Sequence, residues 1–126
     1  MPGATTRNQS LPLYLTVGDS FVWTFLYQTQ STPYVPPVAV NLTGYSVEFV
    51  VKTQSSTPAT VFTWTTGNGK VTVNADSVTG LIKIAALPSD TASVSPGECT
   101  YFIRITDPSG VKTTVLVQPF YISAGI

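Results

Sequence analysis

Leu81-Ile-Lys-Ile-Ala-Ala86 begins the stretch that decides the fold, and Pro88-Ser-Asp-Thr-Ala-Ser-Val-Ser-Pro-Gly97 and Cys99-Thr-Tyr-Phe-Ile-Arg-Ile-Thr106 follow it. The chain then turns at Asp107-Pro-Ser-Gly110 and returns through residues 113–122. Apolar residues that alternate with polar ones between turn residues are typical of half-buried antiparallel strands. Proline favours the start of a helical turn, and Pro96-Gly97 favours its end. The stretch therefore predicts a strand, a short helical turn near residues 88–95, and two strands joined by a hairpin.

The same alternation covers the chain from about residue 10 onward, with further runs at residues 11–17, 21–27, 45–52, 61–65 and 70–73. Seven to eight strands at this spacing predict an all-β, antiparallel immunoglobulin-like β-sandwich. A small closed barrel is the alternative architecture. Residues 10–126 are expected to form this single domain, and residues 1–9 a flexible arm. The expected core consists of Phe21, Trp23, Phe25, Tyr45, Val47, Phe49, Ile82, Ile84, Tyr101, Ile103 and Ile105.

The composition argues against partners that are recognised by charge. Six Lys and Arg residues balance six Asp and Glu residues, and charged residues make up 10% of the chain, against the usual figure of about 25%. A nucleic-acid-binding protein needs clustered positive charge, so we expect no nucleic-acid partner. Proteins near zero net charge tend to associate. A neutral surface therefore favours a subunit packed in an assembly over a monomer whose Thr and Ser only satisfy strand propensity.

The residue types do not favour an enzymatic function. The chain has no histidine, which removes the commonest general base and metal ligand. Most of its carboxylates fall in turns, where they serve backbone hydrogen bonds, so a catalytic carboxylate pair is not expected. Cys99 is the single cysteine and is expected to be buried rather than nucleophilic. The sequence therefore predicts no enzyme and no cofactor or metal site.

The sequence shows no pattern typical of a signal peptide or of a membrane span. Residues 1–10 lack the charged region and apolar run of a signal peptide, so synthesis in a cytoplasm is expected. No apolar run approaches the roughly 18 residues of a membrane span, so we expect no membrane partner.

Candidate protein contacts lie in the polar arm, the first strand, the loop of residues 28–41 and the last strand. The polar arm carries Arg7. Pro12 assigns the first strand, which carries Leu11 and Leu13, to a sheet edge, where an edge of a neighbouring protein could pair with it. Residues 28–41 form a stiff, proline-rich loop. The candidate contact residues are Arg7, Leu11, Leu13, Tyr34, Val35, Pro36, Pro37 and Tyr121.

Several motifs, in a fixed order, resemble one family. Val17-Gly-Asp-Ser-Phe-Val-Trp-Thr-Phe25 and Val40-Asn-Leu-Thr-Gly-Tyr-Ser-Val-Glu-Phe-Val-Val-Lys52 are similar to the opening of small β-sandwich virion proteins of tailed bacteriophages. Their second half is similar to Thr79-Gly-Leu-Ile-Lys-Ile84, Leu87-Pro-Ser-Asp-Thr91, Tyr101-Phe-Ile-Arg-Ile-Thr-Asp-Pro-Ser-Gly110 and Thr114-Val-Leu-Val-Gln-Pro-Phe-Tyr-Ile122. The family resembles the immunoglobulin-like N-terminal domain of baseplate upper proteins, and residues 31–37 are an insertion relative to it.

The resemblance implies attachment rather than catalysis. We expect a non-enzymatic structural component of a virion, associated with the tail or baseplate and present in several copies that bind other virion proteins. A capsid decoration protein is the alternative. A carbohydrate- or cell-surface-binding module is an alternative of another class, and it would present exposed aromatic side chains such as Tyr34, Trp64 or Tyr121.

Overall fold

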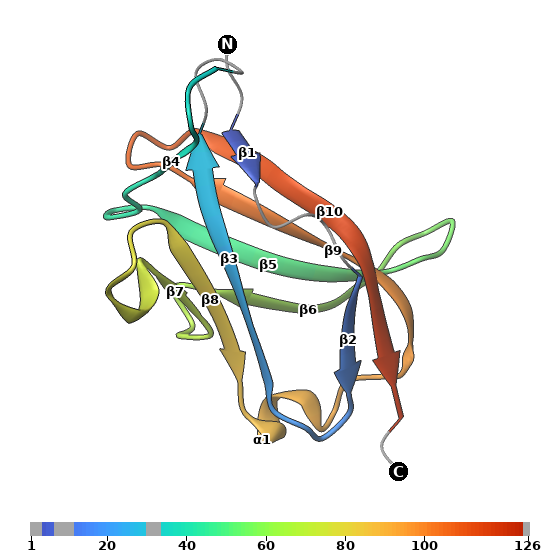
Figure 1. Ribbon diagram of the computed structural model, residues 1–126. Coiled ribbons are helices and arrows are strands. Elements are labelled where there is room, and N and C mark those ends of the chain that lie inside the picture. Colours follow the sequence, from blue (N-terminus) through green and yellow to red (C-terminus); the bar gives the residue numbers. More distant parts are fainter. Residues whose placement is uncertain (1–3, 7–11, 30–33, 125–126) are drawn as a thin grey trace.

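The computed structural model describes residues 4–6, 12–29 and 34–124 of the chain. These residues form an all-β protein with two sheets and one short α-helix (Figure 1). The first sheet has the strand order β1-β3-β8-β7, and β4 also pairs with β3. The second sheet has the order β2-β10-β9-β5-β6. The predicted all-β class is therefore confirmed.

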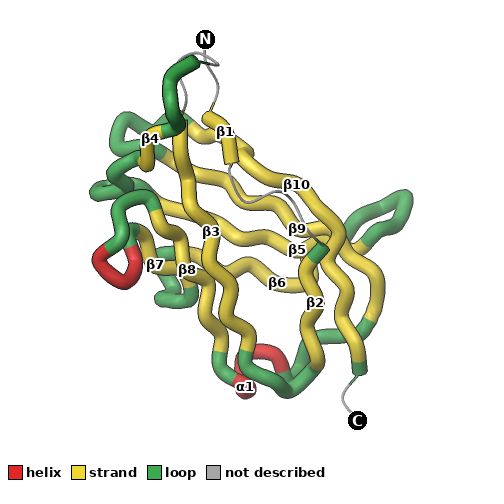
Figure 2. The backbone as a smooth tube through the Cα atoms, viewed as in Figure 1, coloured by secondary structure: helices red, strands yellow, loops and turns green. Residues whose placement is uncertain are grey.

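The strands of each sheet have the following bounds. The first sheet contains β1 (Ala4–Thr6), β3 (Phe21–Thr29), β4 (Val38–Ala39), β7 (Val71–Val73) and β8 (Leu81–Ala86). The second sheet contains β2 (Leu13–Thr16), β5 (Ser46–Thr53), β6 (Thr60–Thr65), β9 (Gly97–Thr106) and β10 (Lys112–Ser123). A 3-10 turn, η1 (Ala75–Ser77), precedes β8, and the helix α1 (Pro88–Thr91) follows it. Figure 2 shows how little of the described chain is helical.

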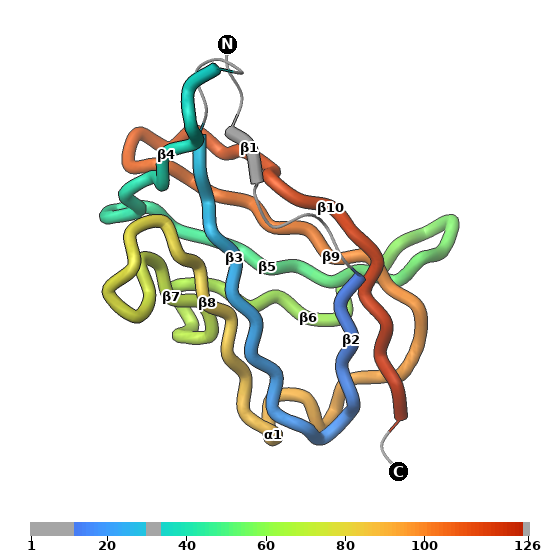
Figure 3. The backbone as a smooth tube through the Cα atoms, viewed as in Figure 1, coloured from blue at the N-terminus to red at the C-terminus, as the bar shows by residue number. Residues whose placement is uncertain are grey.

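The two sheets curl around the core like a half-barrel rather than stacking as a clear immunoglobulin sandwich. In Figure 3, β3 and β8 pass in front of the strands of the second sheet. All pairings of the described strands are antiparallel except that of β2 with β10, which is parallel. The expectation of a purely antiparallel structure is therefore wrong at β2. The ten described strands also exceed the expected seven or eight, because β1 and β4 are too short to show an alternating pattern.

Aromatic side chains dominate the core between the sheets. The ring of Phe49 lies 5.3 Å from that of Tyr101, 5.9 Å from those of Trp64 and Phe120, and 6.3 Å from that of Phe21 (centroid distances). Contacts of this kind stabilise a core beyond the area that each ring buries. The expected core residues are buried except Trp23 and Tyr45, which are half-buried and pack against the cluster.

The register of β9 settles which of its residues face the core. Tyr101 pairs with Val51 and Ile103 with Phe49 on the neighbouring strand β5. Side chains alternate between the two faces of a strand, so Tyr101, Ile103 and Ile105 are buried. Phe102 consequently lies on the outer face of the sheet.

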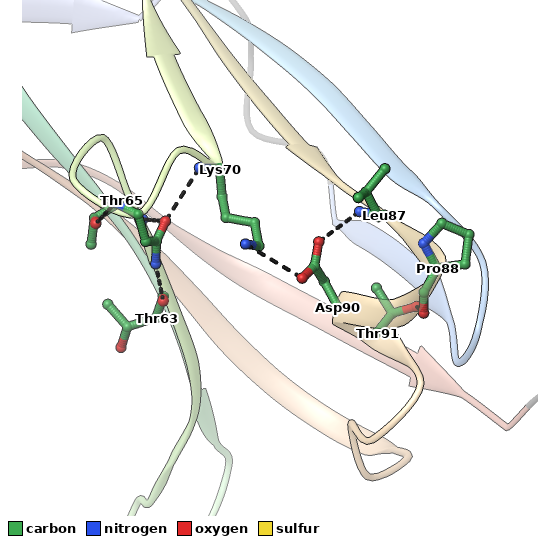
Figure 4. A network of polar contacts seen from close by, with 8 residues as sticks. Thr63, Thr65, Lys70, Leu87, Pro88, Asp90 and Thr91 are labelled. Atoms are coloured by element: carbon green, nitrogen blue, oxygen red, sulfur yellow. Dashed lines mark hydrogen bonds and ion pairs between the residues drawn. The ribbon is translucent and has the colours of Figure 1, made fainter.

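An ion pair links the helix α1 to the turn between β6 and β7. Asp90 accepts a hydrogen bond of 2.8 Å from the backbone N–H of Leu87, which caps the helical turn. The other carboxylate oxygen of Asp90 lies 3.4 Å from Nζ of Lys70, just before β7 (Figure 4). The predicted helical turn is therefore confirmed at Pro88–Thr91.

The turn between β6 and β7 crosses from one sheet to the other and is not a hairpin, because β6 pairs with β5 and β7 pairs with β8. Of the two glycines in this turn, Gly67 and Gly69, Gly69 has a positive φ (83°). The side chain of Asn68, between them, accepts hydrogen bonds from the N–H groups of Thr65 and Lys70, which shapes the turn without a second left-handed residue.

Candidate functional site

Six of the charged residues in the described part of the chain form three separate ion pairs. The ion pairs are Lys70–Asp90 (3.4 Å), Lys83–Asp76 (3.6 Å) and Arg104–Glu48 (3.9 Å). Among the described residues, His, Cys, Asp and Glu side chains form no group of three or more that could hold a metal ion. In the same residues, no helix is long and apolar enough to cross a membrane.

The thiol of Cys99 is poorly suited to nucleophilic chemistry. Cys99 is 2% exposed, and burial raises the pKa of its thiol above the ordinary value. A thiol with a raised pKa stays protonated at neutral pH, whereas the thiolate is the reactive form. The predicted burial of Cys99 is confirmed.

The outer face of the second sheet carries apolar side chains where solvent would favour polar ones. Leu13, Leu15, Phe120 and Ile122 belong to the core. Tyr14 and Tyr121, which alternate with them and pair across β2 and β10, therefore point outward. Their rings stack with centroids 5.3 Å apart, and Tyr14 is 68% exposed.

This apolar row continues along β10 and onto β9. Val117 is 54% exposed and pairs with Phe102, and Pro119 pairs with Thr100. We call the outward-facing residues Tyr14, Tyr121, Pro119, Val117 and Phe102 the outer row. Exposed apolar side chains that adjoin one another on a sheet face mark a contact site more often than single exposed ones do.

Two cations flank the ring of Phe102 at the end of the outer row. Nζ of Lys52 lies 5.8 Å and Cζ of Arg104 lies 5.3 Å from the ring centroid. Arg104 is also paired with Glu48, whereas Lys52 has no ion-pair partner among the described residues. The edge of the outer row therefore carries a positive charge without a paired carboxylate.

A hollow of about 550 Å³ lies beside Phe102. Its floor is formed by Lys52 of β5 and by Thr100 and Phe102 of β9, and its wall by the loop between β5 and β6. In Figure 1 this loop extends away from the two sheets. The lining is more apolar than polar, which is typical of binding pockets of this size.

The expected contact residues fall at separate places. Tyr34 is 94% exposed, Val35 and Pro36 are exposed, and Pro37 is half-buried, all in the segment that leads into β4. In Figure 1 that segment lies at the opposite end of the molecule from the C-terminal end of β10, where Tyr121 belongs to the outer row.

The other residues predicted to make contacts either belong to the core or lie outside the described residues. The side chain of Leu13 belongs to the core and is 9% exposed, so only its main chain can take part in a contact. Arg7 and Leu11 lie outside the described residues. Trp64, a predicted candidate for an exposed aromatic side chain, is only 4% exposed and belongs to the core.

Sequence reasoning missed Tyr14, Val117, Phe102 and Lys52 as parts of one surface. The available signal was the apolar residue at outward positions of β2, β9 and β10, where strict alternation calls for a polar one. That signal becomes specific only once β2 is known to pair with β10, because the pairing brings Tyr14 next to Tyr121.

No protein-family model matches the chain, and no curated protein matches it.

Proposed function

We propose that this chain is a non-enzymatic structural component of a bacteriophage virion, a tail- or baseplate-associated subunit that binds neighbouring virion proteins through its surface. The outer row carries this proposal. A sheet face on which Tyr14 and Val117 are more than half exposed loses apolar area from water when a partner covers it. The balanced charge adds no repulsion between copies.

The proposed fold within this function is immunoglobulin-like, and the strand order supports it. Immunoglobulin-like domains place strands A, B, E and D in one sheet and G, F and C in the other, and variable-type domains add C′ to the second. The orders β1-β3-β8-β7 and β10-β9-β5-β6 correspond to A-B-E-D and G-F-C-C′. The half-barrel curl is the feature in which this chain departs from that pattern.

A carbohydrate-binding module is the second candidate, and the exposed pair Tyr14–Tyr121 favours it. Sugars pack against free faces of aromatic rings. The two rings stack on one another at 5.3 Å, so each covers part of a face of the other. Trp64, the largest aromatic considered for that role, is buried. We therefore rank protein contact first.

Matched substitutions on the two sheets test the proposal. Val117→Lys introduces a charge into the outer row, and Val22→Lys introduces the same charge at an exposed position (62%) of β3, on the other sheet. Both variants should fold normally, because each valine is more than half exposed. Particles produced by the genome that encodes this chain should contain less of the Val117→Lys subunit and a normal amount of the Val22→Lys subunit.

The same substitutions also separate the candidates. Equal incorporation of both variants would contradict contact through the outer row. Normal incorporation of Val117→Lys together with loss of glycan binding by a Tyr14→Ser variant would favour the carbohydrate-binding module.

A further inference from the structure

The wall of the hollow beside Phe102 is held in place before any partner arrives. The N–H of Thr53 donates to the carbonyl of Ala59 (2.9 Å), and the N–H of Ala59 donates to Oγ1 of Thr53 (3.0 Å). Within the loop, the hydroxyl of Ser55 donates to the carbonyl of Thr57 (2.9 Å). A preformed wall lowers the entropy lost when a ligand binds.

The floor of the hollow is fixed as well. Nε2 of Gln54 donates to the carbonyl of Cys99 at 2.8 Å, which ties the loop to β9 next to Thr100. The ring of Phe102 lies on the outer face of the same strand and is half-buried. The hollow therefore offers an apolar floor of fixed shape, which suits a flat or branched apolar side chain.

The charge of the hollow is positive and not compensated by its lining. Lys52 is the only ionisable residue among those that line it. Glu48, the carboxylate nearest to Lys52 along β5, forms an ion pair with Arg104 instead. Because Nζ of Lys52 lies beside the ring of Phe102, an anion that reaches it stands next to an apolar surface.

We propose that this hollow binds a peptide segment of a partner protein in which a carboxylate side chain adjoins an aromatic side chain. The aromatic ring packs on Phe102 and Pro58, and the carboxylate accepts hydrogen bonds from the ammonium group of Lys52. The protein nature of the partner rests on the proposed function, and the recognition chemistry rests on the hollow itself.

Nuclear magnetic resonance on the isolated, full-length chain tests this inference. The probes are short acetylated peptide amides that contain Asp-Phe, Asn-Phe or Asp-Ala between glycines. The Asp-Phe peptide should shift the backbone amide signals of Gln54, Thr100 and Phe102 in a saturable way. The Asn-Phe peptide should bind about two- to fivefold more weakly, as expected for the loss of a partly exposed ion pair. The Asp-Ala peptide should give no saturable shift.

Two variants assign the preference to the lysine. Lys52→Met keeps the aliphatic stem and removes the charge, so the Asp-Phe and Asn-Phe peptides should bind it equally. Lys112→Met is the control, because Lys112 is exposed at the start of β10 and does not line the hollow. This variant should keep the preference for Asp-Phe.

Three results would overturn the inference: no saturable shift with the Asp-Phe peptide, shifts that map to another face, or equal affinity for Asp-Phe and Asn-Phe in the unmodified chain. None of them bears on incorporation into particles, which the experiment with Val117→Lys measures. Failure of this inference and failure of the proposed function are therefore distinguishable.

Discussion

At the scale of single residues, Gly80 shows how one position can be restricted by its backbone. Its φ is +83°, and a Cβ atom added there would lie 2.8 Å from the carbonyl oxygen of Tyr27. The N–H of Gly80 donates to Oδ1 of Asn74, and its carbonyl accepts from the N–H of Tyr27. The residue thus joins β3 to the turn before β8, and no side chain fits.

Gly80→Ala is expected to destabilise the fold more than Gly69→Ala does. Both glycines have φ of +83°, but nothing lies within 4 Å of a Cβ at Gly69. Each change forces a left-handed alanine, at about 1–2 kcal/mol. The contact with Tyr27 adds about 1–3 kcal/mol at Gly80 alone. Urea unfolding of both variants measures the difference, and equal losses would show that the backbone contact is unimportant.

Tyr101 predicts how stability depends on alkaline pH. Its side chain is fully buried, and its hydroxyl has no hydrogen-bond partner within the described residues. Burial raises the pKa of Tyr101 from 10.0 to about 12. The unfolded chain therefore releases this proton first, so stability is retained below about pH 10 and falls as the pH rises toward about 12. A shift of this size corresponds to about 2–3 kcal/mol.

Tyr101→Phe isolates that contribution. Burial also raises the pKa of Tyr27, which gives a loss of the same sign, so the comparison is between variant and wild type. The free energy of unfolding of Tyr101→Phe should match or exceed that of the wild type at neutral pH, because an unpaired hydroxyl is removed. It should then fall less steeply between about pH 10 and 12. An identical alkaline slope in both proteins would rule out Tyr101 as the source.

At the scale of elements, α1 is held by one buried hydroxyl. The side chain of Thr91 is fully buried. Its Oγ1 donates to the carbonyl of Asp19 (2.7 Å) and accepts from the N–H of Gly18 (3.1 Å), both in the turn between β2 and β3. This pair of hydrogen bonds links two segments that are more than 70 residues apart in the chain.

Thr91→Val preserves shape and removes both hydrogen bonds. We expect the free energy of unfolding to fall by about 1–3 kcal/mol, because the backbone groups of the β2–β3 turn lose their hydrogen-bond partner. Thr72→Val, at an exposed position of β7, is the matched control and should change stability by less than about 0.5 kcal/mol. Thermal unfolding compares them, and a Thr91→Val protein as stable as the control would show that these two hydrogen bonds do not hold α1 in place.

The elements also show what the sequence can and cannot predict. The long alternating runs of β3, β5, β8 and β9 were predictable because each buries one face, and the residues on that face are apolar. The proline and glycine residues around α1 were equally informative.

The pairing of the shorter strands was not predictable, since it depends on contacts distant in sequence. The four residues of β2 lie next to β10 in parallel, and nothing in the local pattern specifies that direction. The left-handed conformation of Asn74 likewise goes with a distant contact, because its Oδ1 accepts hydrogen bonds from the N–H of Gly80 and from that of Leu42, 32 residues away in the chain. The outer row was missed for the same reason, since it forms only when β2 and β10 meet.

At the scale of the whole molecule, the two sheets differ in their outer faces. The outer row covers part of the second sheet with apolar groups and ends at the hollow beside Lys52. The first sheet exposes polar residues such as Thr24 and Thr72, and its exposed apolar side chains, Val22 on β3 and Val38 on β4, lie on different strands. This asymmetry predicts that partners contact the second sheet. The first sheet is then expected to face solvent or a neighbour that buries less of its surface.

Cryo-electron microscopy of intact particles from the encoding genome tests the proposed role in a virion. We expect density for this chain at symmetry-related positions in the tail or baseplate, with a neighbouring protein covering the outer row on each copy. Density on the capsid would instead make it a decoration protein with the same contact surface. Absence of the chain from purified particles, or an outer row facing bulk solvent on every copy, would contradict the account.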